Sequence, residues 1–146
     1  MKKKEIKPAL NALKTIKMPR IEDRDLRNAI IKNHLFLLGQ GKKFDAAVED
    51  LRSVHIGPYD QELQEVQAMQ NQLNQETDAG KRKELVEKIN SHTDLLEAIN
   101  AFNKAVMDLE NEEVEVSLID GEKFAEEYGK QDYDANVVEA LFPMFK

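Results

Sequence analysis

The chain has 146 residues, of which 34% are charged and 41% are apolar, so its charged fraction is high for a globular domain. It contains no cysteine, which excludes disulfide bonds, thiolate metal sites and a cysteine nucleophile. No stretch approaches the roughly 18–20 consecutive apolar residues of a membrane-spanning helix. The composition is typical of long helices with one buried stripe, and we expect a cytoplasmic protein that does not contact a membrane.

Charge is distributed unevenly along the chain. Residues 1–43 carry 12 Lys or Arg and 4 Asp or Glu, whereas residues 44–146 carry 9 and 24. A basic segment can bind nucleic acid through phosphate contacts, although the acidic remainder of the same chain competes for it. The candidate nucleic-acid contacts are Lys2, Lys3, Lys4, Lys14, Lys17, Arg20, Arg24 and Arg27.

Two helices are predicted in the N-terminal part. Apolar residues at intervals of three and four, from Ile6 to Ile16, predict a short helix over residues 5–16. Met18-Pro19 ends this helix, because the residue before a proline is pushed out of the helical conformation. A second helix is predicted over residues 22–55.

The second predicted helix carries a regular heptad seam, in which residues alternate at intervals of four and three over more than three heptads. Ile31, Leu35 and Leu38 widen its apolar stripe at the N-terminal half, which indicates two neighbours there. A helix of this length spans about 50 Å, so we expect a partner of similar length and self-association. The predicted interface residues are Ile30, His34, Leu37, Gly41, Phe44, Val48 and Leu51.

Two further helices are predicted after Gly57-Pro58, which ends the second one. The third helix reaches a turn around residues 77–80, where the apolar pattern lapses. The fourth helix is predicted over residues 81–110, with an irregular spacing near residues 92–96.

From residue 112 the period of the apolar residues changes to two. Val114, Val116 and Leu118 alternate with polar residues, which predicts a half-buried strand over residues 113–119. Such a strand needs an edge to pair with, in this chain or in a second one. A turn at Asp120-Gly121 ends it.

The C-terminus is predicted to form short helical pieces. Residues 122–128 suit one or two helical turns, and Asp134 is a suitable N-cap for a helix over residues 135–142 that Pro143 ends. The apolar terminus is expected to dock on the chain's own helices or on a partner. It supplies the remaining predicted interface residues, Leu141, Phe142 and Phe145.

No set of residues in the sequence forms a recognisable catalytic or metal site. Lys42 follows two glycines, but a phosphate-binding loop also requires glycine where Phe36 stands and Ser or Thr where Lys43 stands. None of the three histidines has another histidine three or four residues away, so no helical metal pair exists. We expect neither an enzyme nor a cofactor, and no small-molecule substrate.

Several short motifs occur in order along the chain: Leu10-Asn11-Ala12-Leu13, Met18-Pro19, Phe102-Asn103-Lys104, Glu112-Glu113-Val114-Glu115-Val116 and Ala140-Leu141-Phe142-Pro143. In this order, with a long charged helix after the second motif, the chain resembles a family of small helical proteins encoded by phages and prophages, whose function is unassigned. Residues 59–95 have no counterpart in this resemblance. The resemblance implies an accessory or assembly protein in a bacterial host, located in the cytoplasm or incorporated in a virion.

These observations predict a mainly α fold of long antiparallel helices, as a bundle or coiled-coil hairpin, with a short C-terminal strand and a small helix. Residues 1–110 are expected to form the helical domain, and residues 111–146 an α+β appendage packed on it or on a partner. The function expected is non-enzymatic protein–protein interaction, through self-association or with another phage protein. The alternative is a nucleic-acid-associated accessory protein that uses the basic N-terminal third.

Overall fold

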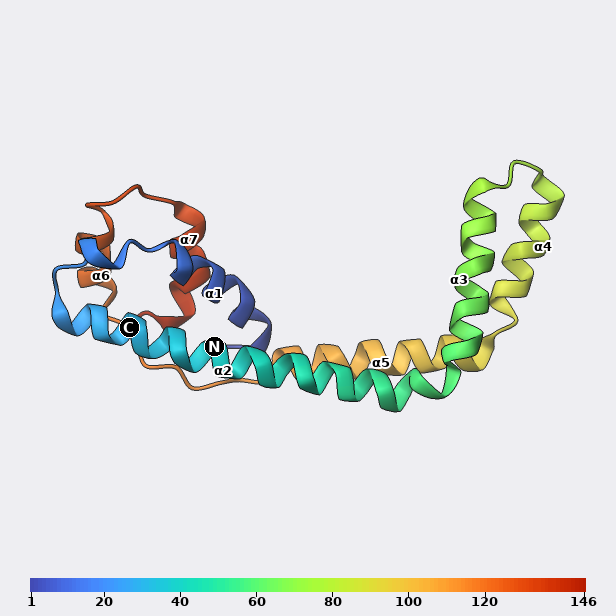
Figure 1. The fold of residues 1–146 in the computed structure, drawn as a ribbon, viewed down its shortest axis with the longest axis horizontal. Coiled ribbons are helices and arrows are strands. Elements are labelled where there is room, and N and C mark those ends of the chain that lie inside the picture. The colour runs from blue at the N-terminus through green and yellow to red at the C-terminus, as the bar shows by residue number, and fades with distance from the viewer. The chain divides into compact units, whose positions relative to one another are not determined.

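The chain is mainly helical, as expected. The computed structural model describes residues 1–146 and contains seven α-helices with no β-strand (Figure 1). Short 3-10 turns connect several of them. The helices are α1 (Ile6–Thr15), α2 (Arg24–His55), α3 (Asp60–Gln75), α4 (Ala79–Asn90), α5 (Thr93–Asn111), α6 (Gly121–Tyr128) and α7 (Ala135–Leu141).

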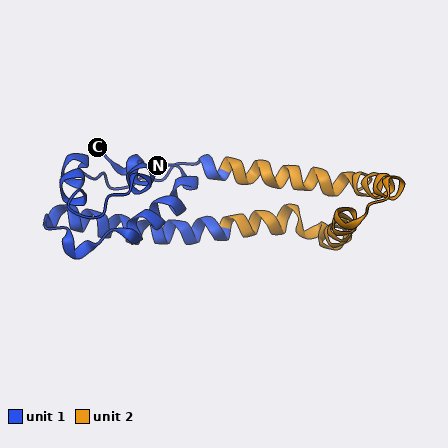
Figure 2. Cartoon of the chain, turned by 90° about the horizontal axis from the view of Figure 1, so that it is seen from above, with its two compact units in different colours: residues 1–46, 109–146 blue, residues 47–108 orange.

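The helices form two compact units (Figure 2). Unit 1 comprises Met1–Ala46 and Leu109–Lys146, and unit 2 comprises Ala47–Asp108. Helices α2 and α5 each contribute to both units. Residues 111–146, which the sequence set apart as an appendage, therefore share a compact unit with the N-terminal helices.

Unit 1 is built around the contact between α1 and α7. The small side chains of Ala9 and Ala12 are buried there, which lets the two helices approach closely. Phe124 on α6 lies in the same core and stacks on Tyr128, with ring centroids 5.2 Å apart. One continuous cluster of buried apolar residues thus joins α1, α2, α6 and α7.

The strand predicted over residues 113–119 is wrong. Only two isolated bridges form, between Lys2 and Glu113 and between Ile119 and Phe145. The segment has no neighbouring strand, and its backbone groups find separate partners instead. Val114 N–H donates to Met1 O at 2.8 Å, and Ile119 N–H donates to Met144 O at 2.8 Å. Backbone groups of this segment therefore form single hydrogen bonds with residues at both ends of the chain, and no strand ladder forms.

Unit 2 contains an antiparallel hairpin of α3 and α4, which pack against each other. The turn predicted around residues 77–80 lies at its tip, where Asp78 caps α4 by accepting the Lys81 N–H at 2.9 Å. Arg82 stabilises the same turn by donating to the backbone carbonyls of Leu73 and Glu76. Val66, Ile89 and Leu95 form the small buried apolar core of unit 2.

The single helix predicted over residues 81–110 is two helices, because the chain breaks between Asn90 and Thr93. The irregular apolar spacing near residues 92–96 coincides with this break. There the His92 ring nitrogen lies 3.2 Å from the Glu62 carboxylate on α3.

None of the seven helices has the length and apolar character that crossing a bilayer requires.

Candidate interaction surface on helix α2

Helix α2 turns one face into the interior of unit 1. Its residues lie at intervals of three and four, so they share one side of the helix. They are Leu26, Ile30, Asn33, Leu37 and Gly41, and all five are buried. This inner face of α2 belongs to the chain's own core.

The predicted interface residues of α2 fall largely on this inner face. Ile30, Leu37 and Gly41 are buried, while His34, Phe44, Val48 and Leu51 are partly buried. Gly41 lies against α1, because a Cβ added there would lie 3.5 Å from the Leu10 side chain. Within unit 1, the expected neighbour of the seam is therefore another part of the same chain.

The predicted C-terminal interface residues have different environments. Leu141 is fully buried in unit 1. Phe145 is partly buried and lies against Phe124, with ring centroids 4.9 Å apart. Phe142 is 71% exposed. Two of the three thus dock on the chain itself, and only Phe142 is open to a partner.

Asn33 is a structural residue that the sequence reading missed. It is buried, its Nδ2 donates to Ser117 O at 2.7 Å, and Ser117 N–H donates to its Oδ1 at 3.0 Å. One amide therefore satisfies both backbone groups of Ser117 and ties the extended segment to α2. The available signal was spacing, because Asn33 lies three residues after Ile30 and four before Leu37.

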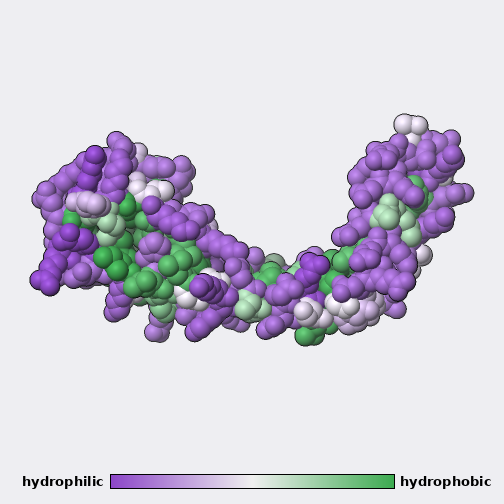
Figure 3. All heavy atoms as spheres, in the orientation of Figure 1, coloured by the Kyte–Doolittle hydropathy of each residue, from purple (hydrophilic) through white to green (hydrophobic).

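A second side of α2 carries an exposed apolar stripe. Ile31, Leu35 and Leu38 are 45%, 67% and 39% exposed, and their spacing of four and three residues places them on one side of the helix. Phe36, which follows Leu35 in the sequence, is also exposed. Figure 3 shows hydrophobic side chains gathered on one face of unit 1. We call Ile31, Leu35 and Leu38 the outer stripe.

Two of the candidate nucleic-acid contacts are neutralised within the chain. Lys3 pairs with Glu112, and Lys17 pairs with Asp132 at 2.7 Å. The hydrogen bond from Lys17 lowers the pKa of Asp132 below its ordinary 3.8. The remaining candidates form no ion pair; they are Lys2, Lys4, Lys14, Arg20, Arg24 and Arg27.

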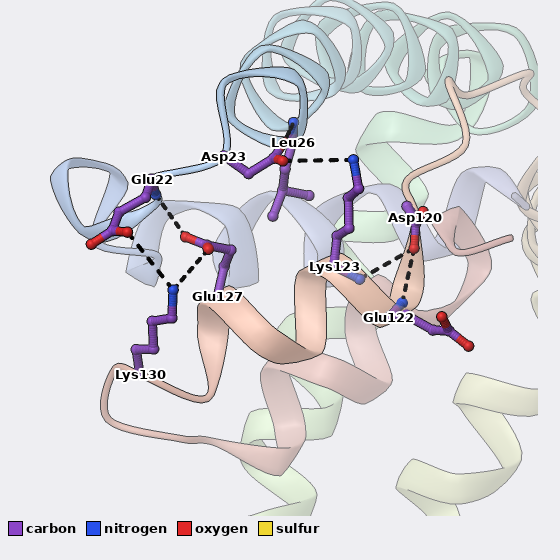
Figure 4. A network of polar contacts seen from close by, with 8 residues as sticks. All are labelled: Glu22, Asp23, Leu26, Asp120, Glu122, Lys123, Glu127 and Lys130. Atoms are coloured by element: carbon purple, nitrogen blue, oxygen red, sulfur yellow. Dashed lines mark hydrogen bonds and ion pairs between the residues drawn. The ribbon is translucent and has the colours of Figure 1, made fainter.

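A polar network joins the start of α2 to α6 (Figure 4). Glu127 on α6 is buried, and its carboxylate accepts the Glu22 N–H at 2.6 Å and the Lys130 ammonium at 2.9 Å. Asp23 accepts the Leu26 N–H at 2.8 Å and so caps the first turn of α2. These contacts hold the first turn of α2 against α6 and so set which side of α2 is turned toward the core.

The same contacts shift the pKa values of Glu127, Lys130 and Asp23. Hydrogen bonds from the Lys130 side chain and then from the Glu22 N–H lower the pKa of Glu127 below its ordinary 4.5. The bond to Glu127 raises the pKa of Lys130 above 10.5. The Leu26 N–H lowers the pKa of Asp23 below 3.8. Each shift favours the charged form, as a structural ion network requires.

We expect the acid stability of unit 1 to depend on Glu127. Its pKa is below 4.5 in the folded protein, so the unfolded chain binds the proton more tightly. The stabilisation is complete above the ordinary pKa and is lost as pH falls through the lowered one. The urea midpoint of the parent should therefore fall more steeply between pH 5 and 3 than that of Glu127→Gln.

Glu126→Gln is the matched control, because Glu126 is the exposed neighbour of Glu127 on α6. It should retain the steep acid limb of the parent. Parallel pH profiles for the parent and Glu127→Gln would contradict the role assigned to this carboxylate.

The remaining surface offers little that resembles a chemical site. A depression of about 480 Å³ lies between α3 and α4, lined mainly by glutamine, glutamate and lysine side chains. No group of three or more His, Asp or Glu residues is placed to hold a metal ion. No buried side-chain nitrogen or oxygen lacks a hydrogen-bond partner. The outer stripe is a group of exposed apolar side chains on one side of a helix that the chain's own packing leaves uncovered.

Comparisons of the chain with protein-family models, with curated proteins and with solved structures found no match.

Proposed function

We propose that the chain is a non-enzymatic protein-binding protein and that the outer stripe of α2 is its contact surface. The observation that carries this proposal is the exposure of Ile31, Leu35 and Leu38 on one side of α2, while a different side of the same helix is buried in a filled core. Exposed apolar side chains that are grouped on one surface mark protein-interaction sites, whereas single exposed apolar residues are ordinary. A helix face of this kind suits packing against another helix.

The inner face of α2 supports the proposal because its side chains are already buried and hydrogen-bonded within the chain. Leu26, Ile30 and Leu37 bury their side chains, and Asn33 has both amide groups bonded. The helix therefore has one neighbour inside the chain and one apolar face without a neighbour. This division matches the second neighbour that the widened apolar stripe of the sequence indicates.

The biological setting follows from the resemblance to phage and prophage proteins. In that setting the chain is an accessory or assembly protein that holds other proteins, or copies of itself, together. The nucleic-acid alternative has less support, because Lys3 and Lys17 already pair with acidic side chains of the same chain.

Site-specific photo-crosslinking tests the proposal. A photoreactive phenylalanine analogue in place of Leu35 should give a discrete crosslinked protein product in cells that express the chain. The same analogue in place of Val54, an exposed apolar residue of α2 outside the outer stripe, should not. A product from Val54 and none from Leu35 would refute the surface assignment.

We also expect Leu38→Lys, introduced together with the photoreactive analogue at Leu35, to abolish the crosslink without unfolding the chain. The lysine would place a charge in the contact, which is costly to bury. In the isolated chain Leu38 is 39% exposed, so a long polar side chain fits there at small cost in stability. Circular dichroism should show parental helicity, and a crosslink that persists would contradict the proposal.

A further inference from the structure

The outer stripe lies at the centre of a longer regular repeat on α2. Intervals of four and three residues continue from it in both directions and span about three and a half heptads, the extent typical of a coiled-coil seam. The positions are Arg24, Asn28, Ile31, Leu35, Leu38, Lys42, Asp45 and Glu49, all of them exposed. The repeat has an apolar centre, a basic start and an acidic end.

We propose that a second copy of this chain covers the outer stripe, with the two α2 helices antiparallel. This inference rests on the proposed function and names the partner of the same surface. It places the contact on a different side of α2 from the heptad seam that the sequence suggested.

The apolar centre fixes the register. The repeat has two kinds of position, those that follow an interval of four residues and those that follow an interval of three. In an antiparallel helix pair, each layer joins a residue of one kind on the first helix to a residue of the other kind on the second helix. The register that pairs Leu35 with Leu38 of the second copy forms two such leucine layers, related by the twofold axis. It also places the aliphatic stem of Lys42 over Ile31, with the ammonium free to reach water.

The charges at the ends favour this register and this direction. It sets Arg24 opposite Glu49 of the second copy, and Asn28 opposite Asp45. A parallel pair would set every one of these charges against its own kind, which is unfavourable. An antiparallel pair slipped by one heptad would set Arg24 against Lys42 in one direction, and Leu35 against Asp45 in the other. Charge complementarity and the two leucine layers together thus select one arrangement of two identical helices.

The surroundings of the stripe leave room for this partner. Gly39, on the same side of α2, has no atom within 4 Å of the place where a Cβ would stand. Asp45 lies at 2.8 Å from Lys7 through one carboxylate oxygen, so its other oxygen can accept from Asn28 of the second copy.

Spin labelling measures the direction of the pair directly. The chain has no cysteine, so Asn28→Cys provides a single labelling position in each copy. In the antiparallel register residue 28 faces residue 45 of the other copy, which separates the two labelled positions by about 25 Å along the helices. In a parallel pair they would lie about 10 Å apart.

Matched variants test the contacts by sedimentation equilibrium. Leu35→Lys should give a monomer at concentrations where the parent is a dimer, because it removes both leucine layers. Arg24→Glu should weaken dimerisation about two- to five-fold, as expected for an exposed ion pair, and adding Glu49→Arg should restore it. Lys104→Glu on α5, an exposed lysine outside the repeat, should leave the dimer unchanged.

The outcomes separate this inference from the proposed function. A parent that stays monomeric at 200 µM overturns the second copy as the occupant, while a crosslink from Leu35 to a different protein would sustain the proposed function. A dimer with labels about 10 Å apart overturns the antiparallel arrangement. A dimer that survives Leu35→Lys, together with no crosslink from Leu35, overturns both proposals.

Discussion

Leu37→Asp should unfold unit 1, whereas Leu35→Asp, two residues away on the same helix, should leave it folded. Leu37 is fully buried on the inner face of α2, and Leu35 is on the outer stripe. The buried aspartate loses the apolar packing of the leucine and leaves a charge without a partner. Together these cost about 3–5 kcal/mol or more, a large part of the about 5–15 kcal/mol that stabilises a typical domain.

Urea denaturation followed by circular dichroism compares the two variants. Leu37→Ala is the milder companion, because it creates a cavity without introducing a charge and should cost about 2–5 kcal/mol. It should lower the urea midpoint while leaving a cooperative transition. If Leu35→Asp and Leu37→Asp destabilise the isolated chain equally, the assignment of the two faces of α2 is wrong.

Asn33→Ala should destabilise unit 1 by about 2–6 kcal/mol. The variant leaves the N–H and the C=O of Ser117 without their partners in a partly buried place, and each unpaired group costs about 1–3 kcal/mol. Lys32→Ala is the control, because Lys32 is exposed on the same helix, lies outside the proposed repeat and should change stability by less than about 0.5 kcal/mol.

Hydrogen exchange gives this second prediction a local readout. The amide of Ser117 should exchange much faster in Asn33→Ala, because its acceptor is the Oδ1 atom that the variant lacks. Asn33→Asp distinguishes the two bonds, since its carboxylate can still accept the Ser117 N–H but cannot donate to the Ser117 carbonyl. An unchanged exchange rate in Asn33→Ala would show that the extended segment is held by other contacts.

Helices were predictable from the sequence because their signals are local. Apolar spacing and proline position placed α1 and α2 to within about two residues, and Asp134 caps α7 as expected through its bond to the Asn136 N–H. The strand failed because alternation at Val114, Val116 and Leu118 describes the side chains alone. Strand formation also needs a neighbouring edge, and that is a property of the whole fold.

The occupant of a buried face could not be predicted from its periodicity. Spacing correctly indicated that α2 has an apolar face with Leu37 at its centre, but the same spacing results from a neighbour in the chain or in another chain. Asn33 was missed because a polar side chain interrupts an apolar pattern even where its hydrogen bonds make burial favourable. The outer stripe was visible in the sequence only as extra width of the apolar pattern.

Because unit 1 takes its residues from both ends of the chain, its assembly has a fixed timing during synthesis. Residues 1–46 emerge from the ribosome before residues 109–146, so their core lacks α6 and α7 until that later segment has followed. The contacts between α1 and α7 close a loop that contains the whole of unit 2, and closing long loops slows folding. Unit 2 is continuous in sequence and can fold earlier, so the nascent chain carries an exposed and incomplete core of unit 1 until residues 109–146 are translated.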